Sequence, residues 1–147
     1  MGRQNSDRRP IRGTGGCLCG AVRYEVCGPL RAVVACHCSQ CRRTSGHFAA
    51  FTATRPEDLD LVESGELRWY RSSATTRRGF CGVCGSNLFW EPASGGRVSI
   101  AAGTLDPPTE LATAVHVFVE DAGDYYAIED GLPQRADGDH GIEIPDG

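Results

Sequence analysis

The sequence contains no lysine, because all fifteen basic residues among its 147 are arginines. Any anion bound through a positive side chain therefore meets a guanidinium, whose planar fork suits carboxylates. An excess of positive charge is also missing, since nineteen acidic residues leave a formal net charge of −4. This argues against a nucleic-acid partner, which usually selects a basic stripe on the protein surface.

Long apolar segments are absent as well. No stretch approaches the roughly 18 uncharged apolar residues that span a bilayer, so we expect no membrane partner. The opening residues, MGRQNSDRRPIRGTGG, lack the apolar core of a secretory signal. We therefore expect a cytoplasmic protein in a reducing compartment, where thiols persist.

A sustained helical period is missing, and short runs bounded by glycine-rich turns take its place. The runs expected as strands are 21–26, 32–35, 47–54, 67–71, 87–90, 97–101, 115–119 and 125–128. Only 56–62 suggests a helical turn, with Pro56 suited to its first position. We predict a mainly β, single domain of short antiparallel strands over residues 13–133. A disordered leader over 1–12 precedes it and a polar tail over 134–147 follows.

Cysteine, in contrast, is plentiful, and its eight copies are grouped. At about 5% of the residues, the content is below that of a disulfide scaffold. Close grouping in a reducing compartment indicates metal binding or catalysis. The groups are Cys17 and Cys19, then Cys36, Cys38 and Cys41, then Cys81 and Cys84, with Cys27 alone.

The two outer pairs predict one closed zinc site. Cys81 and Cys84 form a CxxC turn followed by Gly85, and Cys17 and Cys19 form a tighter pair. Neither pair completes a tetrahedron, but together they supply four thiolates and leave no vacant position. Such a site is structural, and here it would join the two halves of the sheet.

The middle group predicts a second, open zinc site. Cys36 and Cys38 share one face of an extended segment, and a turn through Ser39 and Gln40 brings in Cys41. Three ligands leave one position for water or substrate, as in catalytic zinc sites. Zn²⁺ with three thiolate ligands has a net charge of −1, which suits the binding of a substrate thiolate better than the formation of hydroxide.

Other interpretations of the cysteines are weaker. Eight cysteines allow 105 disulfide pairings, but CxC pairs rarely bridge well. A thioredoxin-like CxxC normally opens a helix, whereas the residues after Cys84 continue as a strand. A cysteine nucleophile with His37 as base is geometrically poor, since neighbouring residues on a strand face opposite sides.

Five stretches carry a family resemblance: GGCLCGAVRYEV (15–26), CHCSQCRRTSG (36–46), FCGVCGSNLF (80–89), AAGTLD (101–106) and the HVFVE to YYAIEDGLP region (116–133). Together they resemble the glutathione-dependent formaldehyde-activating enzymes, a family that shares its domain with centromere protein V. The resemblance implies an Mss4-like fold, a structural zinc on the outer pairs and a catalytic zinc on the middle group. It also implies a carbon–sulfur lyase that joins formaldehyde to glutathione, similar to S-(hydroxymethyl)glutathione synthase.

Other residues have more open interpretations. Arg42 and Arg43 follow the middle group and are candidates to bind the carboxylates of a glutathione-like thiol; Arg77 and Arg78, before the CxxC, could do the same. His37 either orients a substrate or bonds on the opposite strand face. Cys27 is expected to be a small buried side chain.

Three alternatives to catalysis stay open. The first is a glutathione or thiol carrier without turnover. The second is a zinc-held interaction module, and the third is a zinc store that holds its open-site metal loosely.

Overall fold

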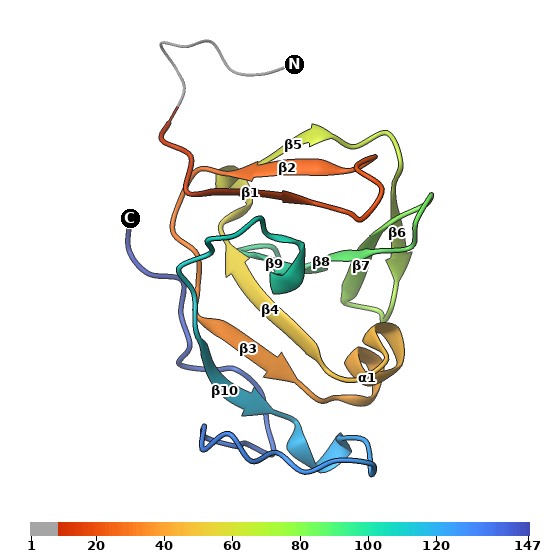
Figure 1. Cartoon of the computed structure of the whole chain (residues 1–147), viewed down its shortest axis with the longest axis vertical. Helices are drawn as coiled ribbons and strands as arrows, with labels where there is room; N and C mark the ends of the chain where they lie inside the picture. Colours follow the sequence, from red (N-terminus) through yellow and green to blue (C-terminus); the bar gives the residue numbers. More distant parts are fainter. Residues whose placement is uncertain (1–8) are drawn as a thin grey trace.

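Two β-sheets form the frame of the protein (Figure 1). The structure is a computed structural model and describes residues 9–147. The first eight residues of the expected leader lie outside the described residues. The prediction of a mainly β, Mss4-like fold of short strands is confirmed.

The smaller sheet has three antiparallel strands in the order β1-β2-β5. They are β1 (Gly13–Gly16), β2 (Arg23–Val26) and β5 (Leu59–Glu63). Tyr24 and Val26 alternate with half-buried positions on β2 and point into the core, as the two-residue period of a strand requires.

The larger sheet has seven strands in the order β10-β3-β4-β9-β8-β7-β6. All its pairings are antiparallel except that of β10 with β3, which is parallel. Its strands are β3 (Val33–Cys36), β4 (Ala49–Thr54), β6 (Leu67–Arg71), β7 (Thr76–Cys81), β8 (Asn87–Pro92), β9 (Val98–Ala101) and β10 (Thr113–Val117). Helix α1 (Ser39–Ser45) follows β3, and single 3-10 turns are η2 (Pro56–Asp58), η3 (Ala102–Thr104) and η4 (Val119–Asp121).

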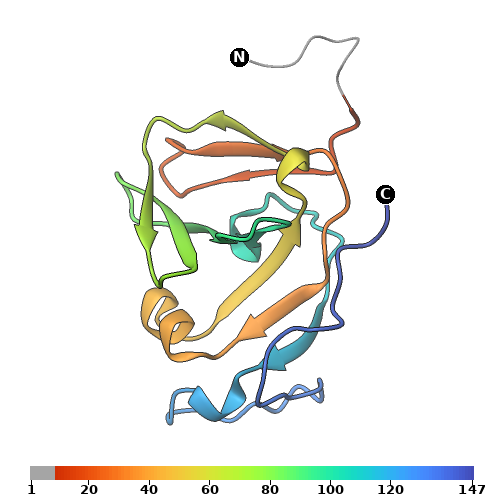
Figure 2. The ribbon, with the colours of Figure 1, turned by 180° about the vertical axis from the view of Figure 1, so that it is seen from behind.

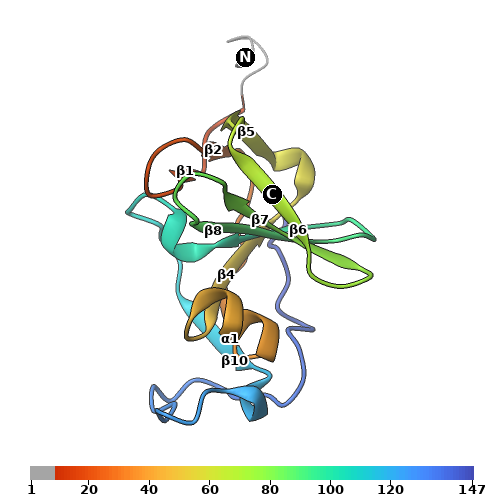
Figure 3. The ribbon, with the colours of Figure 1, turned by 90° about the vertical axis from the view of Figure 1, so that its right-hand side faces the viewer.

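The main core lies between the sheets. Val22, Tyr24, Leu88, Phe89 and Ile100 are almost fully buried there, and each large apolar side chain contributes about 1.5–3 kcal/mol by leaving water. The rings of Tyr24 and Phe89 meet edge to face with centroids 5.4 Å apart, the favoured aromatic geometry. Figure 3 shows the small sheet above β6, β7 and β8, with α1 on the opposite side.

Most sequence-based strands are confirmed, with some differences. The run 125–128 was predicted as a strand, and this is wrong because the residues form a turn and irregular backbone. The run 56–62 divides into η2 and the beginning of β5. Strand β7 and helix α1 had no clear signal, since both carry adjacent arginines and polar residues in place of a regular apolar period.

The C-terminal segment 134–147 packs against the larger sheet (Figure 2). Its backbone bonds to β10, with the Arg135 N–H 2.9 Å from the His116 carbonyl oxygen. Asp139 lies 2.7 Å from Arg31 Nη1 and 2.8 Å from Arg97 Nη1. Within residues 9–147, no helix is long and apolar enough to cross a bilayer.

Candidate metal centres and the adjoining cavity

The sulfurs of Cys17, Cys19, Cys81 and Cys84, the four-cysteine cluster, all lie within 4.8 Å of one another. The Cys17–Cys19 and Cys19–Cys81 sulfur distances are 3.7 and 3.8 Å. A tetrahedron with zinc–sulfur distances of about 2.3 Å requires sulfurs about 3.8 Å apart. The cluster therefore fits a closed four-thiolate zinc site.

The four-cysteine cluster connects the two sheets. Cys17 and Cys19 lie in the loop between β1 and β2, while Cys81 ends β7 and Cys84 precedes β8. The sequence had indicated a link between halves of one sheet, and the structure places this link between the small and the large sheet.

Hydrogen-bond donors surround these sulfurs. The Val22 N–H lies 3.2 Å from Cys17 Sγ, and the N–H groups of Val83 and Cys84 lie 3.4 Å from Cys81 Sγ. The Ser86 hydroxyl, followed by the Ser86 backbone N–H, lowers the pKa of Cys84 to about 5. Donors of this kind favour thiolates, the form in which cysteine binds a metal.

Cys36, Cys38 and Cys41, the three-cysteine cluster, also have sulfurs within 4.8 Å of one another. Cys36 ends β3, Cys38 caps the N-terminus of α1 and Cys41 lies in its first turn. The turn expected at Ser39–Gln40 is thus the opening of a helix. No fourth histidine, cysteine or carboxylate of the described residues joins the group.

The Cys38 sulfur is the most acidic of this cluster. The thiols of Cys36 and then Cys41 donate to it, which lowers the pKa of Cys38 to about 2. The Cys41 backbone N–H adds a donor at 3.3 Å. Three converging sulfurs with one already poised as thiolate fit a metal held by three ligands.

A cavity of about 400 Å³ opens at the three-cysteine cluster. Phe51, Trp90 and Val117 contribute apolar surface to its lining. The charged side chains in the lining are Arg31, Arg78, Arg97 and Asp139. A largely apolar space with a few convergent polar groups is the usual form of a small-molecule site.

The arginines predicted to bind substrate lie elsewhere. Arg42 donates from Nε to the Asp121 carbonyl oxygen at 3.1 Å, and Arg43 is exposed on α1. Neither is among the residues that line the cavity, whereas Arg78 of β7 is. The sequence raised Arg78 together with Arg77 and could not separate them.

Neighbours on both faces of β7 explain this difficulty. Alternation places Arg77 and Cys81 on one face of the strand and Arg78 on the other, and the pairing of β7 with β6 is regular throughout. On the first face the Arg77 guanidinium lies over the ring of Trp69 but stays exposed. On the other face Arg78 is buried, with its guanidinium against Cys41 of α1.

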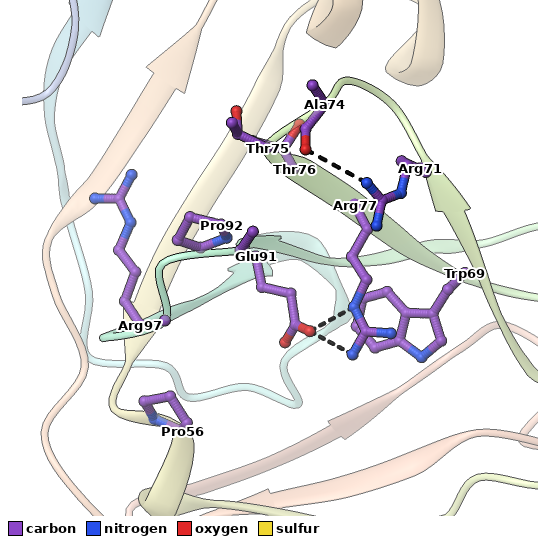
Figure 4. Close-up of a pocket in the computed structure, with 12 residues that line it drawn as sticks. Pro56, Trp69, Arg71, Ala74, Thr75, Thr76, Arg77, Glu91, Pro92 and Arg97 are labelled. Carbon is purple, nitrogen blue, oxygen red and sulfur yellow. Dashed lines mark hydrogen bonds and ion pairs between the residues drawn. The ribbon is translucent and has the colours of Figure 1, made fainter.

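Arg77 lies at a different hollow (Figure 4). Its guanidinium stacks 3.8 Å from the ring centroid of Trp69, and its Nε donates to Glu91 Oε1 at 2.6 Å. Among the described residues, those that line this hollow include no cysteine. The two neighbouring arginines thus line different hollows, Arg77 this one and Arg78 the cavity at the three-cysteine cluster.

His37 belongs to a buried polar chain behind the three-cysteine cluster. Its Nε2 lies 2.9 Å from His116 Nδ1, and its Nδ1 lies 2.6 Å from the Tyr126 hydroxyl. His116 Nε2 lies 2.7 Å from Asp130 Oδ2. His37 is fully buried, so the structure assigns it hydrogen bonds on the face opposite the sulfurs. Cys27 is buried outside both clusters.

These features define a cysteine-rich protein with two clusters that could hold metal ions, one of four cysteines and one of three, the second at a cavity. The model of the glutathione-dependent formaldehyde-activating enzyme family matches residues 12–121. The chain belongs to this family, and the resemblance noted in the sequence is confirmed.

The proteins similar to the chain include one curated relative and one solved structure. One is described as an uncharacterized lyase of Schizosaccharomyces pombe, 32% identical over 82 residues, which are 55% of this chain and 58% of the relative. The chain thus spans less than two thirds of that relative's length. The other is a crystal structure of a Rhodobacter sphaeroides protein, with 31% identity and a TM-score of 0.55 over 64% of this chain and 88% of the other.

Proposed function

We propose that the protein is a carbon–sulfur lyase that joins a glutathione-like thiol to a formaldehyde-like aldehyde, or separates them, through an S-hydroxymethyl adduct. One observation carries this proposal. The three-cysteine cluster offers three sulfurs and no fourth protein ligand among the described residues, and it opens into the 400 Å³ cavity. Membership of the family and the lyase named among its relatives support the same chemistry.

Two zinc ions per chain fit the cysteine arrangement. The four-cysteine cluster would hold a structural ion, and the three-cysteine cluster a catalytic one. Zinc held by three thiolates would keep a substrate thiol ionised at neutral pH.

The protein's own residues would bind the two substrates and hold the three-cysteine cluster in place. The apolar surface of Phe51, Trp90 and Val117 would pack against the carbon atoms of the bound thiol and aldehyde. The thiol gives up its proton to solvent, its sulfur electron pair forms the new bond to the aldehyde carbon, and the carbonyl oxygen takes a proton from solvent. The hydrogen bonds that join Tyr126, His37, His116 and Asp130 hold the segment between Cys36 and Cys38 in place.

Zinc analysis, binding and turnover test this proposal. We expect two zinc ions per chain, saturable glutathione binding by calorimetry, and acceleration of S-(hydroxymethyl)glutathione formation followed by NMR. Cys38→Ser removes binding and turnover, whereas Cys27→Ala, at a buried cysteine outside both clusters, keeps them. Binding without any acceleration would instead identify a thiol carrier.

A zinc-held interaction module is the second candidate. Leu18 is 89% exposed and Val83 is 63% exposed, and they project from the two loops of the four-cysteine cluster. Exposed apolar side chains on loops that a metal would hold rigid are suited to a protein–protein interface. This candidate predicts neither glutathione binding nor turnover with two zinc ions present.

A further inference from the structure

The charges that line the site cavity are unevenly paired. Arg31 and Arg97 both contact Asp139 Oδ2, at 2.7 and 2.8 Å. Arg78 lines the same cavity and forms no ion pair with any described residue. Arg78 is only 8% exposed. A buried guanidinium without a carboxylate is uncommon, because burial of an uncompensated charge is costly.

The hydrogen bonds of Arg78 are incomplete as well. Its Nη2 lies 3.6 Å from Cys41 Sγ and 3.4 Å from Gln40 Oε1. Its Nε is buried and has no acceptor in the described protein. In a guanidinium, Nε–H and Nη2–H form one edge, which is the fork that binds a carboxylate with two hydrogen bonds. This edge therefore lies beside Cys41 and has one donor unused.

We propose that Arg78 binds a carboxylate of the thiol ligand and makes the open metal centre selective for thiols that carry one. This inference rests on the proposed function, in that the ligand's sulfur occupies the open position of the three-cysteine cluster. Arg78 Nη2 lies 3.6 Å from Sγ of Cys41, one of the three sulfurs that would hold the metal. The guanidinium and the open position of the cluster therefore face the same cavity, where a single ligand can meet both.

Stabilisation of the Cys41 thiolate is a simpler role for the same side chain. The two roles differ in what they predict for ligands. A guanidinium that only stabilises Cys41 affects all thiols alike, because every thiol meets the same metal centre. A guanidinium that receives a carboxylate affects acidic thiols and leaves their neutral isosteres unchanged.

Calorimetry on the zinc-loaded protein separates these roles. The probes are 3-mercaptopropionate, its neutral isostere 3-mercaptopropionamide, and propionate, which lacks the thiol. In the natural protein we expect the acid to bind about tenfold or more tightly than the amide, as a charge-assisted hydrogen bond provides. Propionate binds far more weakly than either, since it lacks the sulfur.

Three variants locate the source of this preference. In Arg78→Gln, 3-mercaptopropionate binds more weakly, so that its affinity equals that of the amide. Arg78→Lys keeps part of the preference for the acid, because lysine retains the positive charge without the planar fork. Arg77→Gln keeps the full preference, since Arg77 lies at the other hollow with Trp69 and Glu91. Zinc content and thermal unfolding are measured on every variant, and Arg78→Lys replaces Arg78→Gln if the latter loses zinc.

Several results would overturn the inference. They are equal affinity of acid and amide in the natural protein, full preference kept in Arg78→Gln, loss of preference in Arg77→Gln, or parallel weakening of both thiols in Arg78→Gln. Absence of any thiol binding overturns this inference together with the thiol chemistry on which it rests. A clear preference without turnover of thiol and aldehyde supports Arg78 as carboxylate receptor and removes only the lyase activity.

Discussion

His37 Nε2 and His116 Nδ1 are 2.9 Å apart in a buried hydrogen bond, and the groups at either end fix its direction. The His116 side chain donates to Asp130, which lowers the pKa of that carboxyl. His116 Nδ1 is then an acceptor, so His37 Nε2 donates and His37 Nδ1 accepts from Tyr126. Each ring nitrogen of His37 and His116 then has a hydrogen-bond partner, as buried polar groups require.

The direction of this chain predicts the effect of removing one hydroxyl. Tyr126→Phe leaves His37 Nδ1 buried without a donor, and we expect a loss of about 1–3 kcal/mol in the free energy of unfolding. Tyr125→Phe is the matched control, because Tyr125 is largely exposed where its hydroxyl meets His47. Urea unfolding of both variants checks this, and equal losses would contradict the assigned chain.

The two cysteine clusters should differ in what they support. Cys17→Ser breaks the link between the sheets and removes most of the roughly 5–15 kcal/mol that stabilises a small domain. Cys38→Ser loses one zinc ion and stays folded, with a change below about 2 kcal/mol. The zinc content of both variants shows which site is lost, and circular dichroism shows whether each variant stays folded. Unfolding of both would refute the division of roles between the two clusters.

Metal removal should follow the same order. A site with three protein ligands exchanges more easily than a closed site with four. During titration with a chelator, the first zinc equivalent leaves without a change in far-ultraviolet circular dichroism, and unfolding accompanies the second. Simultaneous release of both ions with unfolding would argue against an open centre. Cys27→Ala should follow the natural protein throughout, since it lies outside both clusters.

Asp139 gives the fold a predictable response to acid. Burial by itself would raise the pKa of Asp139, but Arg97 and Arg31 outweigh it and hold the pKa below its ordinary value. The ionised carboxylate therefore stabilises the fold fully above the ordinary carboxyl pKa of about 3.9. This stabilisation is lost as the pH falls through the lower pKa of the folded state.

The natural protein should thus lose more stability than Asp139→Asn between pH 5 and pH 3, values set about the ordinary carboxyl pKa. Urea midpoints of both proteins across this range provide the measurement. Because acid also displaces zinc from thiolates, only the difference between the two proteins is interpreted. Parallel curves would mean that the contacts with Arg31 and Arg97 do not stabilise the ionised form.

The sequence predicted those features that depend on local spacing. The CxC, CxCxxC and CxxC patterns identified both cysteine clusters, because the ligands of each pair or trio lie within one turn of backbone. The β-strands with regular alternation, such as β2 and β6, were also found.

Features that depend on long-range pairing could not be read in this way. The burial of Arg78 depends on α1, which brings Gln40 and Cys41 to its guanidinium from 38 and 37 residues away, and no local period reveals this contact. Tyr126 lies in a run whose aromatic residues suggested a strand, yet its hydroxyl reaches His37, 89 residues away. Asp139 stood in an apparently polar tail and pairs with Arg31 across 108 residues.

The position of Asp139 in the sequence has a consequence for the charge of the cavity. The cysteines and Arg78 lie within residues 12–121, which the family model matches, whereas Tyr126, Asp130 and Asp139 lie beyond them. The cysteine clusters and most of the cavity lining therefore lie in the matched stretch, and the segment after it adds Gly138 and Asp139 to the lining. A change in the last stretch that removes Asp139 would leave the cysteine clusters and Arg78 in place, yet it would strip Arg31 and Arg97 of the carboxylate they share and make the cavity more positive.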